Sequence, residues 1–225
     1  MSVQQRRTRF GFFLALLWCC TAGAAHALTL ADLVGGGSFQ SGNGQLTFSD
    51  FELVVAGVLS PDPGAYTIEI QDTGFRIAGD ALQIAAGEAG DLLLQYRVTT
   101  APGSSIERAA LSFQASVLGA GSLAAVAEDL FSVPGSGDPL GSLAVGVSGG
   151  GFSQTSDEVF FTGFPTELLA LKDIQLIATQ GAGDVSIASV DQSFATQSVP
   201  EPGLALLFLS GGAAILVARK RRQQA

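Results

Sequence analysis

Cysteine, histidine, tryptophan and methionine are absent from most of this 225-residue chain. All of them occur before residue 28, as Met1, Trp18, Cys19, Cys20 and His26. Residues 28–199 therefore offer no disulfide partner, no imidazole base and no Cys or His ligand for zinc. Ser-His-Asp and Cys-His catalytic arrangements are excluded from this segment for the same reason.

Positive charge is also scarce between residues 28 and 199. This segment has four basic and nineteen acidic residues, a formal net charge of −15, compared with −9 for the whole chain. Because no basic patch can meet phosphates, we exclude nucleic acid as a partner. The acidity is typical of a solvated surface that keeps a protein soluble.

Carboxylates are the remaining candidates for chemistry. Two adjacent pairs occur, Glu128–Asp129 and Asp157–Glu158. Neighbouring residues on a strand point to opposite faces, so neither pair forms an acid/base couple of the kind a glycosidase uses. We interpret both pairs as surface residues and predict no catalytic residue.

Metal and cofactor signals are weak. Asp62, Asp138 and Asp184 lie in expected loops, and calcium bound by such oxygens is an alternative, although no Asp-x-Asp-x-Asp array is present. The segment Gly119-x-Gly121-x-x-Ala124 matches a dinucleotide fingerprint only superficially, because no strand–turn–helix context surrounds it. We therefore predict no metal site and no cofactor.

Hydrophobic residues alternate with polar ones along much of the chain, which predicts half-buried strands. The clearest runs are 92–98 and 108–117, and the turn composition Ala101-Pro102-Gly103-Ser104 between them predicts an antiparallel hairpin. Other expected strands are 45–55, 66–70, 75–77, 158–162, 173–179 and 185–190. Short strands with Gly-rich turns favour an all-β fold, an antiparallel β-sandwich.

Outside these strands the pattern is less regular. Residues 30–34 and 124–130 suggest short helical turns, 134–151 a long loop or edge, and 192–198 a spacer. Phenylalanine must supply much of the burial that disulfides do not. The expected core aromatics are Phe48, Phe51, Phe75, Phe113, Phe160, Phe161 and Phe194.

The N-terminus has the three parts of a signal peptide. Arg6, Arg7 and Arg9 precede the apolar run 10–20. Ala25 and Ala27 then form a small-x-small cleavage site, which predicts that the mature chain starts at Leu28. We expect export through the general secretion machinery and cleavage by signal peptidase.

The C-terminus has a second tripartite device. Val199-Pro200-Glu201-Pro202 precedes the uncharged run 203–218 and the basic stop Arg219-Lys220-Arg221-Arg222. Sixteen helical residues span roughly 24 Å, slightly less than the ~30 Å hydrocarbon core of a bilayer. The basic residues should remain cytoplasmic, which places everything before Val199 outside the cytoplasm. An ordinary single-span anchor with a Pro-rich stalk is the alternative.

This tail resembles the PEP-CTERM sorting signal of Gram-negative bacteria that make exopolysaccharide. The resemblance covers about a tenth of the chain and implies a membrane processing enzyme, exosortase, that recognises the motif and removes the tail. It divides the chain into a signal peptide (1–27), a β-sandwich ectodomain (28–197) and a sorting signal (198–225). The transmembrane helix would hold the precursor in the inner membrane before the mature domain becomes periplasmic, outer-surface or extracellular.

These observations predict a non-enzymatic envelope or extracellular-matrix protein linked to exopolysaccharide or biofilm. A polysaccharide- or calcium-binding module of the cell surface is the alternative, and a carboxylate-based glycoside hydrolase is a third. The sugar-binding reading has little aromatic support, because the ectodomain has no Trp and only Tyr66 and Tyr96.

Overall fold

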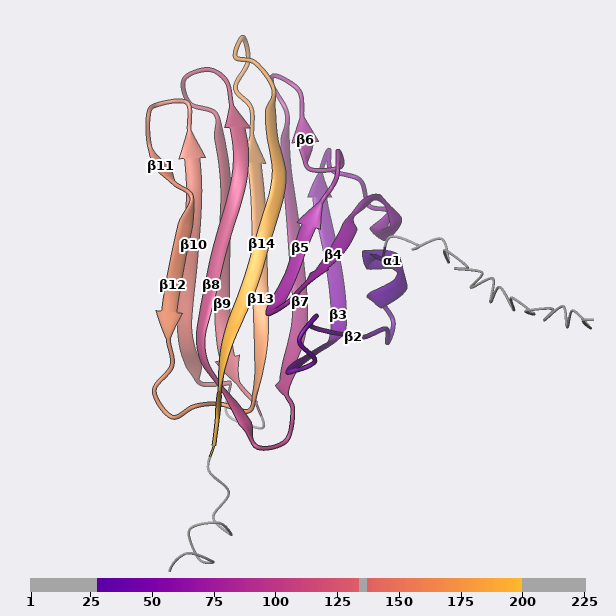
Figure 1. Ribbon diagram of the computed structural model, residues 1–225. Helices are drawn as coiled ribbons and strands as arrows, with labels where there is room; N and C mark the ends of the chain where they lie inside the picture. Colours follow the sequence, from indigo (N-terminus) through magenta and orange to yellow (C-terminus); the bar gives the residue numbers. More distant parts are fainter. Residues whose placement is uncertain (1–27, 134–136, 200–225) are drawn as a thin grey trace, which may run out of the picture.

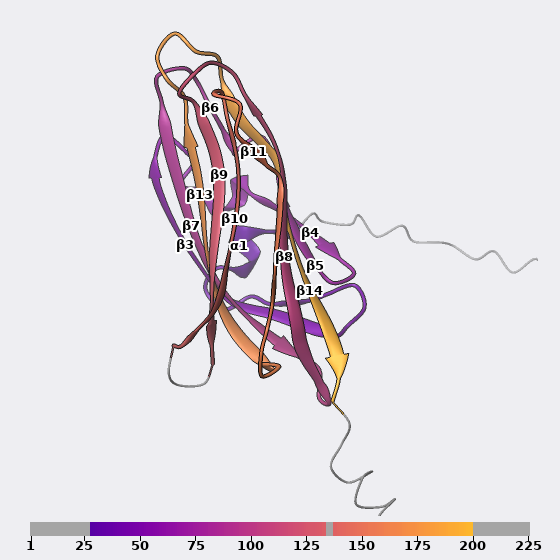
Figure 2. The same cartoon turned by 90° about the vertical axis from the view of Figure 1, so that its left-hand side faces the viewer.

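The computed structural model describes residues 28–133 and 137–199. Within these ranges, two seven-stranded sheets of antiparallel pairs face each other (Figures 1 and 2), which confirms the predicted β-sandwich. The predicted signal peptide, transmembrane helix and basic tail lie outside the described residues. In the part that is described, no helix is long and apolar enough to cross a membrane.

The front sheet, nearer the viewer in Figure 1, has the order β1-β4-β5-β14-β8-β12, and β6 also pairs with β14. Its strands are β1 (Leu28–Thr29), β4 (Thr67–Gln71), β5 (Gly74–Ala78), β6 (Gln83–Ile84), β8 (Ser104–Val117), β12 (Ser156–Phe160) and β14 (Val185–Ser198).

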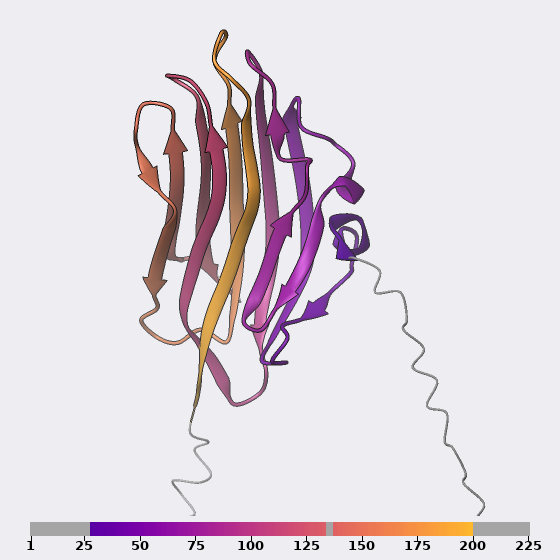
Figure 3. The same ribbon diagram turned by 45° about the horizontal axis from the view of Figure 1, so that its top comes forward.

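The back sheet has the order β11-β10-β9-β13-β7-β3-β2. Its strands are β2 (Phe39–Gln40), β3 (Leu46–Gly57), β7 (Ala89–Thr100), β9 (Leu123–Ser132), β10 (Pro139–Ser148), β11 (Ser153–Gln154) and β13 (Glu167–Ile177). The predicted helical turn at residues 30–34 is α1 (Leu30–Leu33), which lies at the β3–β4 side of the sandwich (Figure 3) beside the 3₁₀ turn Pro63–Ala65.

Alternation along each strand decides which face is buried. On β7 the side chains of Leu92, Leu94, Tyr96 and Val98 are fully buried between the sheets, whereas Leu93 is exposed. The same period of two runs through β8, β13 and β14. The core is therefore a continuous layer contributed by the inward faces of both sheets.

An aromatic cluster holds one half of this core together. Phe48 of β3 stacks on Phe39 with 4.9 Å between ring centroids and meets Phe75 of β5 edge-on at 5.3 Å. Tyr96 of β7 also meets Phe75 edge-on, at 5.2 Å. Phe75 belongs to the front sheet and the other three to the back sheet, so these ring contacts tie the layers together without a disulfide.

The predicted hairpin between residues 92–98 and 108–117 is wrong. β7 pairs with β3 and β13 in the back sheet, while β8 pairs with β14 and β12 in the front sheet. The short turn between β7 and β8, in which Gly103 has a φ of 77°, connects the back sheet to the front sheet. Alternation predicts a strand but does not choose its partner.

Four further expectations need correction. Residues 124–130 form part of β9 rather than a helical turn. The segment 134–151, expected as a long loop or edge, contains the ten-residue strand β10, beside the two-residue edge strand β11. The expected spacer at 192–198 is the end of β14, which pairs with β8 as far as Ser198. Phe160 is not in the core: its side chain is 61% exposed, because on β12 it is the neighbouring position, Val159, that packs inward. The other six expected core phenylalanines are buried.

Candidate functional site

A groove of about 700 Å³ opens on the outer face of the front sheet. Its volume lies within the range of ~300–1,000 Å³ typical of ligand sites. Five strands contribute to it, and most of its lining is polar. The lining residues are Gln71, Arg76, Ala110, Leu111, Ser112, Gln114, Ser156, Asp157, Glu158, Asp191 and Ser193.

Strand register explains why the sheet is hollow here. In one row across the sheet, Ser112 of β8 lies between Asp191 of β14 and Ser156 of β12. In the next row, Ser193 of β14 lies opposite Ala110 of β8. Small side chains therefore form the floor, and longer side chains stand at either side of it.

One wall of the groove is a fixed hydrogen-bonded network. Asp191 Oδ1 accepts a hydrogen bond from Arg76 Nε at 2.7 Å and from Gln71 Nε2 at 2.8 Å. Arg76 also meets Glu69 at 3.4 Å. The hydrogen bond and charge of Asp191 raise the pKa of Arg76, so the guanidinium stays charged. The network fixes planar polar groups at the groove without help from a ligand.

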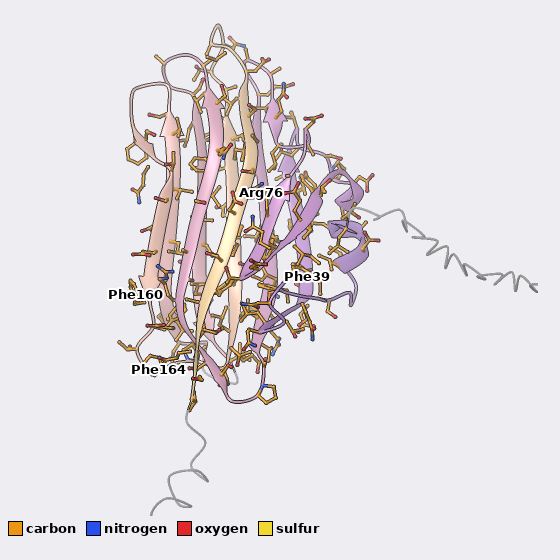
Figure 4. All side chains as sticks on the ribbon, viewed as in Figure 1. Phe39, Arg76, Phe160 and Phe164 are labelled. Atoms are coloured by element: carbon orange, nitrogen blue, oxygen red, sulfur yellow. The ribbon has the colours of Figure 1, made fainter. Side chains whose placement is uncertain are left out.

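An exposed aromatic side chain lies next to the groove on β12: Phe160 is two residues beyond the lining residue Glu158 and is not itself part of the lining. Arg108 of β8 pairs with Glu158 of β12 at 2.8 Å and lies over the Phe160 ring at 5.7 Å from its centroid. Phe160 and Arg76 are labelled in Figure 4 on opposite sides of the front sheet. An exposed aromatic ring beside polar groups is the usual composition of a sugar platform.

The two adjacent carboxylate pairs do point to opposite faces, as predicted. Glu158 faces outward to Arg108, whereas Asp157 turns toward β10 and accepts a hydrogen bond from the backbone N of Ala144 at 2.9 Å. In the other pair, Asp129 is exposed but Glu128 is 1% exposed. The surface assignment of Glu128 is therefore wrong.

A different pair of carboxylates is brought together on the back sheet. Asp173 of β13 lies beside Asp91 of β7, although 82 residues separate them in the sequence. Burial, followed by the hydrogen bond and charge of Asp91, raises the pKa of Asp173 to about 6. This pair lies on β7 and β13 of the back sheet, away from the front-sheet groove.

The loop acids considered for calcium do not converge. Asp62 caps the 3₁₀ turn by accepting from Gly64 N at 2.9 Å. Asp138 precedes β10 and Asp184 precedes β14, at opposite ends of the sandwich (Figure 1). Among the residues that the structure describes, no three acidic, His or Cys side chains are grouped as a metal site.

Other sequence candidates have simple structural settings. Gly119 and Gly121 lie in the turn before β9, which is a strand, so no helix follows to bind a pyrophosphate. Leu28 begins β1, and Val199 N donates to Gly103 O at 2.8 Å. The remaining sorting, cleavage and basic-stop residues (Ala25, Ala27, Pro200, Glu201, Pro202, Arg219, Lys220, Arg221, Arg222) lie outside the described ranges.

A second, smaller hollow of about 390 Å³ lies on the back sheet. Arg97 crosses it, with Asp50 Oδ2 at 2.7 Å from Nε and Glu167 on its other side. Asp50 adopts a φ of 54° at a β-bulge in β3. The Arg97 guanidinium is thus paired with a carboxylate through Nε and through Nη1. The lining aromatic residue, Phe51, is buried rather than exposed.

No protein-family model matches the chain, and no curated protein matches it in sequence. Among solved structures, the carbohydrate-binding module TmCBM61, determined with β-1,4-galactotriose, aligns over 65% of this chain and 88% of its own, with 13% identity and a TM-score of 0.35. The enzymatically active domain of bacteriophage CBA120 tailspike protein 4 aligns over 65% and 20%, with 11% identity and a TM-score of 0.32.

A carbohydrate-binding module of the β-sandwich superfamily aligns over 65% of this chain and 55% of its own, with 11% identity and a TM-score of 0.27. TM-scores of this size do not identify a shared function. The functional argument therefore rests on the groove itself.

Proposed function

We propose that this chain is an exported, non-enzymatic surface protein whose β-sandwich binds a neutral polysaccharide segment in the front-sheet groove. The observation that carries the proposal is the groove's construction: a floor of Ser and Ala beside fixed planar polar groups, with the exposed Phe160 ring two residues along β12 from the lining residue Glu158. Sugars are recognised by such a combination of hydrogen-bonding groups and an apolar ring face.

The negative charge of the domain favours a neutral glycan over an acidic one. Arg76 and Arg108 are already paired with Asp191 and Glu158, and residues 28–199 carry a formal charge of −15. An acidic polysaccharide would meet net repulsion at this surface. A neutral chain of hydroxyl groups fits the alternating donors and acceptors of the groove.

The same contacts favour binding over hydrolysis. Each groove carboxylate has an assigned structural partner: Asp191 holds Arg76, Glu158 holds Arg108, and Asp157 accepts from backbone amides. Hydrolysis needs one carboxyl group that donates a proton and another on the far side of the bond. The groove is a binding surface in this account.

The sequence supports a cellular location for this activity. The signal peptide, Pro200-Glu201-Pro202, the apolar run 203–218 and the basic stop support export followed by exosortase-type removal of the tail. The mature domain would then act in the envelope or matrix, in contact with exopolysaccharide. Mass spectrometry of the protein from its producing cells tests this, since a surface form that retains Arg219 to Arg222 contradicts tail removal.

Calorimetric titration of the purified protein with neutral oligosaccharides, including fragments of the producer's own exopolysaccharide, tests the binding. Phe160→Ala should weaken binding about 2–13-fold, since an aromatic contact contributes ~0.5–1.5 kcal/mol. Phe152→Ala is the matched control, because Phe152 is 56% exposed but lies between β10 and β11 of the back sheet, whereas Phe160 is on the groove-lining strand β12. Absence of heat with every glycan, or equal weakening by both variants, overturns the proposal.

Calcium can be tested in the same titration. The contacts of the groove carboxylates are with protein groups, so we expect the same dissociation constant with calcium and with EDTA. A dissociation constant that rises at least tenfold in EDTA would instead support the calcium-dependent alternative.

A further inference from the structure

Four polar side chains are enclosed between the two sheets, away from the groove. Tyr96 of β7, Glu128 of β9, Lys172 of β13 and Gln192 of β14 are each at most 1% exposed. Glu128 and Lys172 face each other across neighbouring strands of the back sheet, and Gln192 reaches them from the front sheet. A lysine and a glutamate almost never occur at such depth unless they are paired.

The lysine amine contacts both other polar groups. Lys172 Nζ lies 3.1 Å from Glu128 Oε1 and donates a hydrogen bond to Gln192 Oε1 at 2.8 Å. The Tyr96 hydroxyl donates to the same Glu128 oxygen. Among the described residues, Gln192 Nε2 and Glu128 Oε2 have no hydrogen-bond partner. The Lys172 amine thus links the Gln192 amide to the Glu128 carboxylate, and the NH₂ group of that amide has no hydrogen-bond partner among the described residues.

The environment makes the Lys172 ammonium easier to deprotonate than a lysine in water. Burial lowers the pKa of Lys172, opposed by the charge and hydrogen bond of Glu128. Burial also raises the pKa of Tyr96 well above its ordinary value, so the phenol remains a hydrogen-bond donor that orients Glu128. A desolvated lysine amine is a nucleophile, and an adjacent carboxylate can carry its proton.

We infer that Lys172 and Gln192 become joined by an amide cross-link between the two sheets, formed with Glu128 as the proton carrier. Glu128 takes one proton from the Lys172 ammonium, and the free Nζ attacks Cδ of Gln192 to form the new C–N bond. Glu128 passes its proton to Nε2 and takes back the second proton from Nζ. The Cδ–Nε2 bond then breaks and ammonia leaves.

The reaction balances without any other reactant. One amide replaces another, one ammonia is released, and Glu128 ends in its protonated form. The buried ion pair is thereby replaced by neutral groups, which removes two desolvated charges from the core. The 2.8 Å hydrogen bond from Lys172 Nζ to Gln192 Oε1 keeps the amine and the amide together, which supplies the rate advantage of an intramolecular reaction.

The cross-link would do the work of a disulfide in a segment that has no cysteine. It closes a loop between β13 and β14 and fastens the back sheet to the front sheet at the level of the core. A covalent tie of this kind is insensitive to reductants, unlike a disulfide. It suits a protein that acts outside the cell.

Mass spectrometry of the folded full chain, isolated with its natural processing, tests this directly. The expected result is a loss of about 17 Da and a fragment in which Lys172 is linked to Gln192, as covalent lysine chemistry requires. Asn43-Gly44 can also lose ammonia by cyclising, so the measurement is repeated on Asn43→Ser, which should keep the loss. An unmodified Lys172 and Gln192 in folded protein overturns the inference.

Variants separate the chemistry from folding. Glu128→Gln keeps the shape but cannot carry the proton, so the mass loss should disappear. Lys172→Arg keeps the positive charge and should also prevent the linkage. If Glu128→Gln does not fold, Tyr96→Phe is the second variant, and it should slow the appearance of the linked fragment after refolding. A linked fragment that forms at the wild-type rate in Glu128→Gln or in Tyr96→Phe contradicts the assigned roles.

Discussion

Phe48→Ala should remove a large part of the stability of the sandwich. Phe48 is fully buried, and its ring meets Phe39, Phe75, Tyr96 and Phe194 at centroid distances of 4.9 to 6.3 Å. Truncation of a core Phe costs about 3–5 kcal/mol. Because the four ring contacts are lost as well, we expect a value near the upper end, against a total of about 5–15 kcal/mol for a domain.

Urea unfolding followed by circular dichroism measures this loss. The midpoint should fall strongly while the slope of the transition is preserved, since the fold itself is unchanged. Phe152→Ala is the control: its ring is 56% exposed, and the change should stay within about 0.5 kcal/mol. A loss below about 1.5 kcal/mol for Phe48→Ala would refute the claim that the aromatic cluster holds the sheets together.

Two other substitutions test electrostatics and strand packing. The raised pKa of Asp173 means that its folded-state proton stabilises the protein below about pH 4, and this contribution is lost as the pH rises through about 6. Asp173→Asn should therefore raise the melting temperature at pH 7 and leave it almost unchanged at pH 4. The control Asp129→Asn changes an exposed carboxylate and should give no such difference between the two pH values. An Asp173→Asn variant that is less stable than the wild type at pH 7 would contradict the raised pKa of Asp173. Gly74→Ala should destabilise by more than about 2 kcal/mol, because a Cβ there would lie 1.8 Å from Gln192 O. Gly150→Ala is the control, because the nearest atom to a Cβ at Gly150 is 3.7 Å away, and its melting temperature should be close to that of the wild type. Equal melting temperatures for the two glycine variants would show that β5 can move away from β14.

Strand positions could be read from the sequence, because burial on one face imposes a period of two. β7 and β8 follow this pattern through most of their length. Their partners could not be predicted, since a short turn can lead either to the next strand of a sheet or across to the facing sheet. β9 was misread because the Ala-rich run 124–127 has high helix propensity, which packing between β10 and β13 overrides.

The sites were harder to foresee than the strands. The groove depends on small residues such as Ala110 and Ser193, which carry no sequence signal and meet only through strand register. The sequence predicts both Phe160 and Phe161 in the core, because two adjacent phenylalanines do not show which of them faces inward on the strand. The sequence predicts Glu128 as a surface residue and gives no sign that it faces Lys172, because only the pairing of β9 with β13 and the contact with Gln192 bring these side chains together in the core.

Filling the groove tests its assignment as the glycan site most directly. Ser112 lies on the groove floor beside Asp191 and Ser156, with its side chain outside the core. Ser112→Trp should place a large side chain in the groove and reduce the affinity for a bound neutral oligosaccharide at least about 100-fold, with an unfolding midpoint close to that of the wild type. Wild-type affinity in this variant would contradict the account, because the glycan would then bind elsewhere.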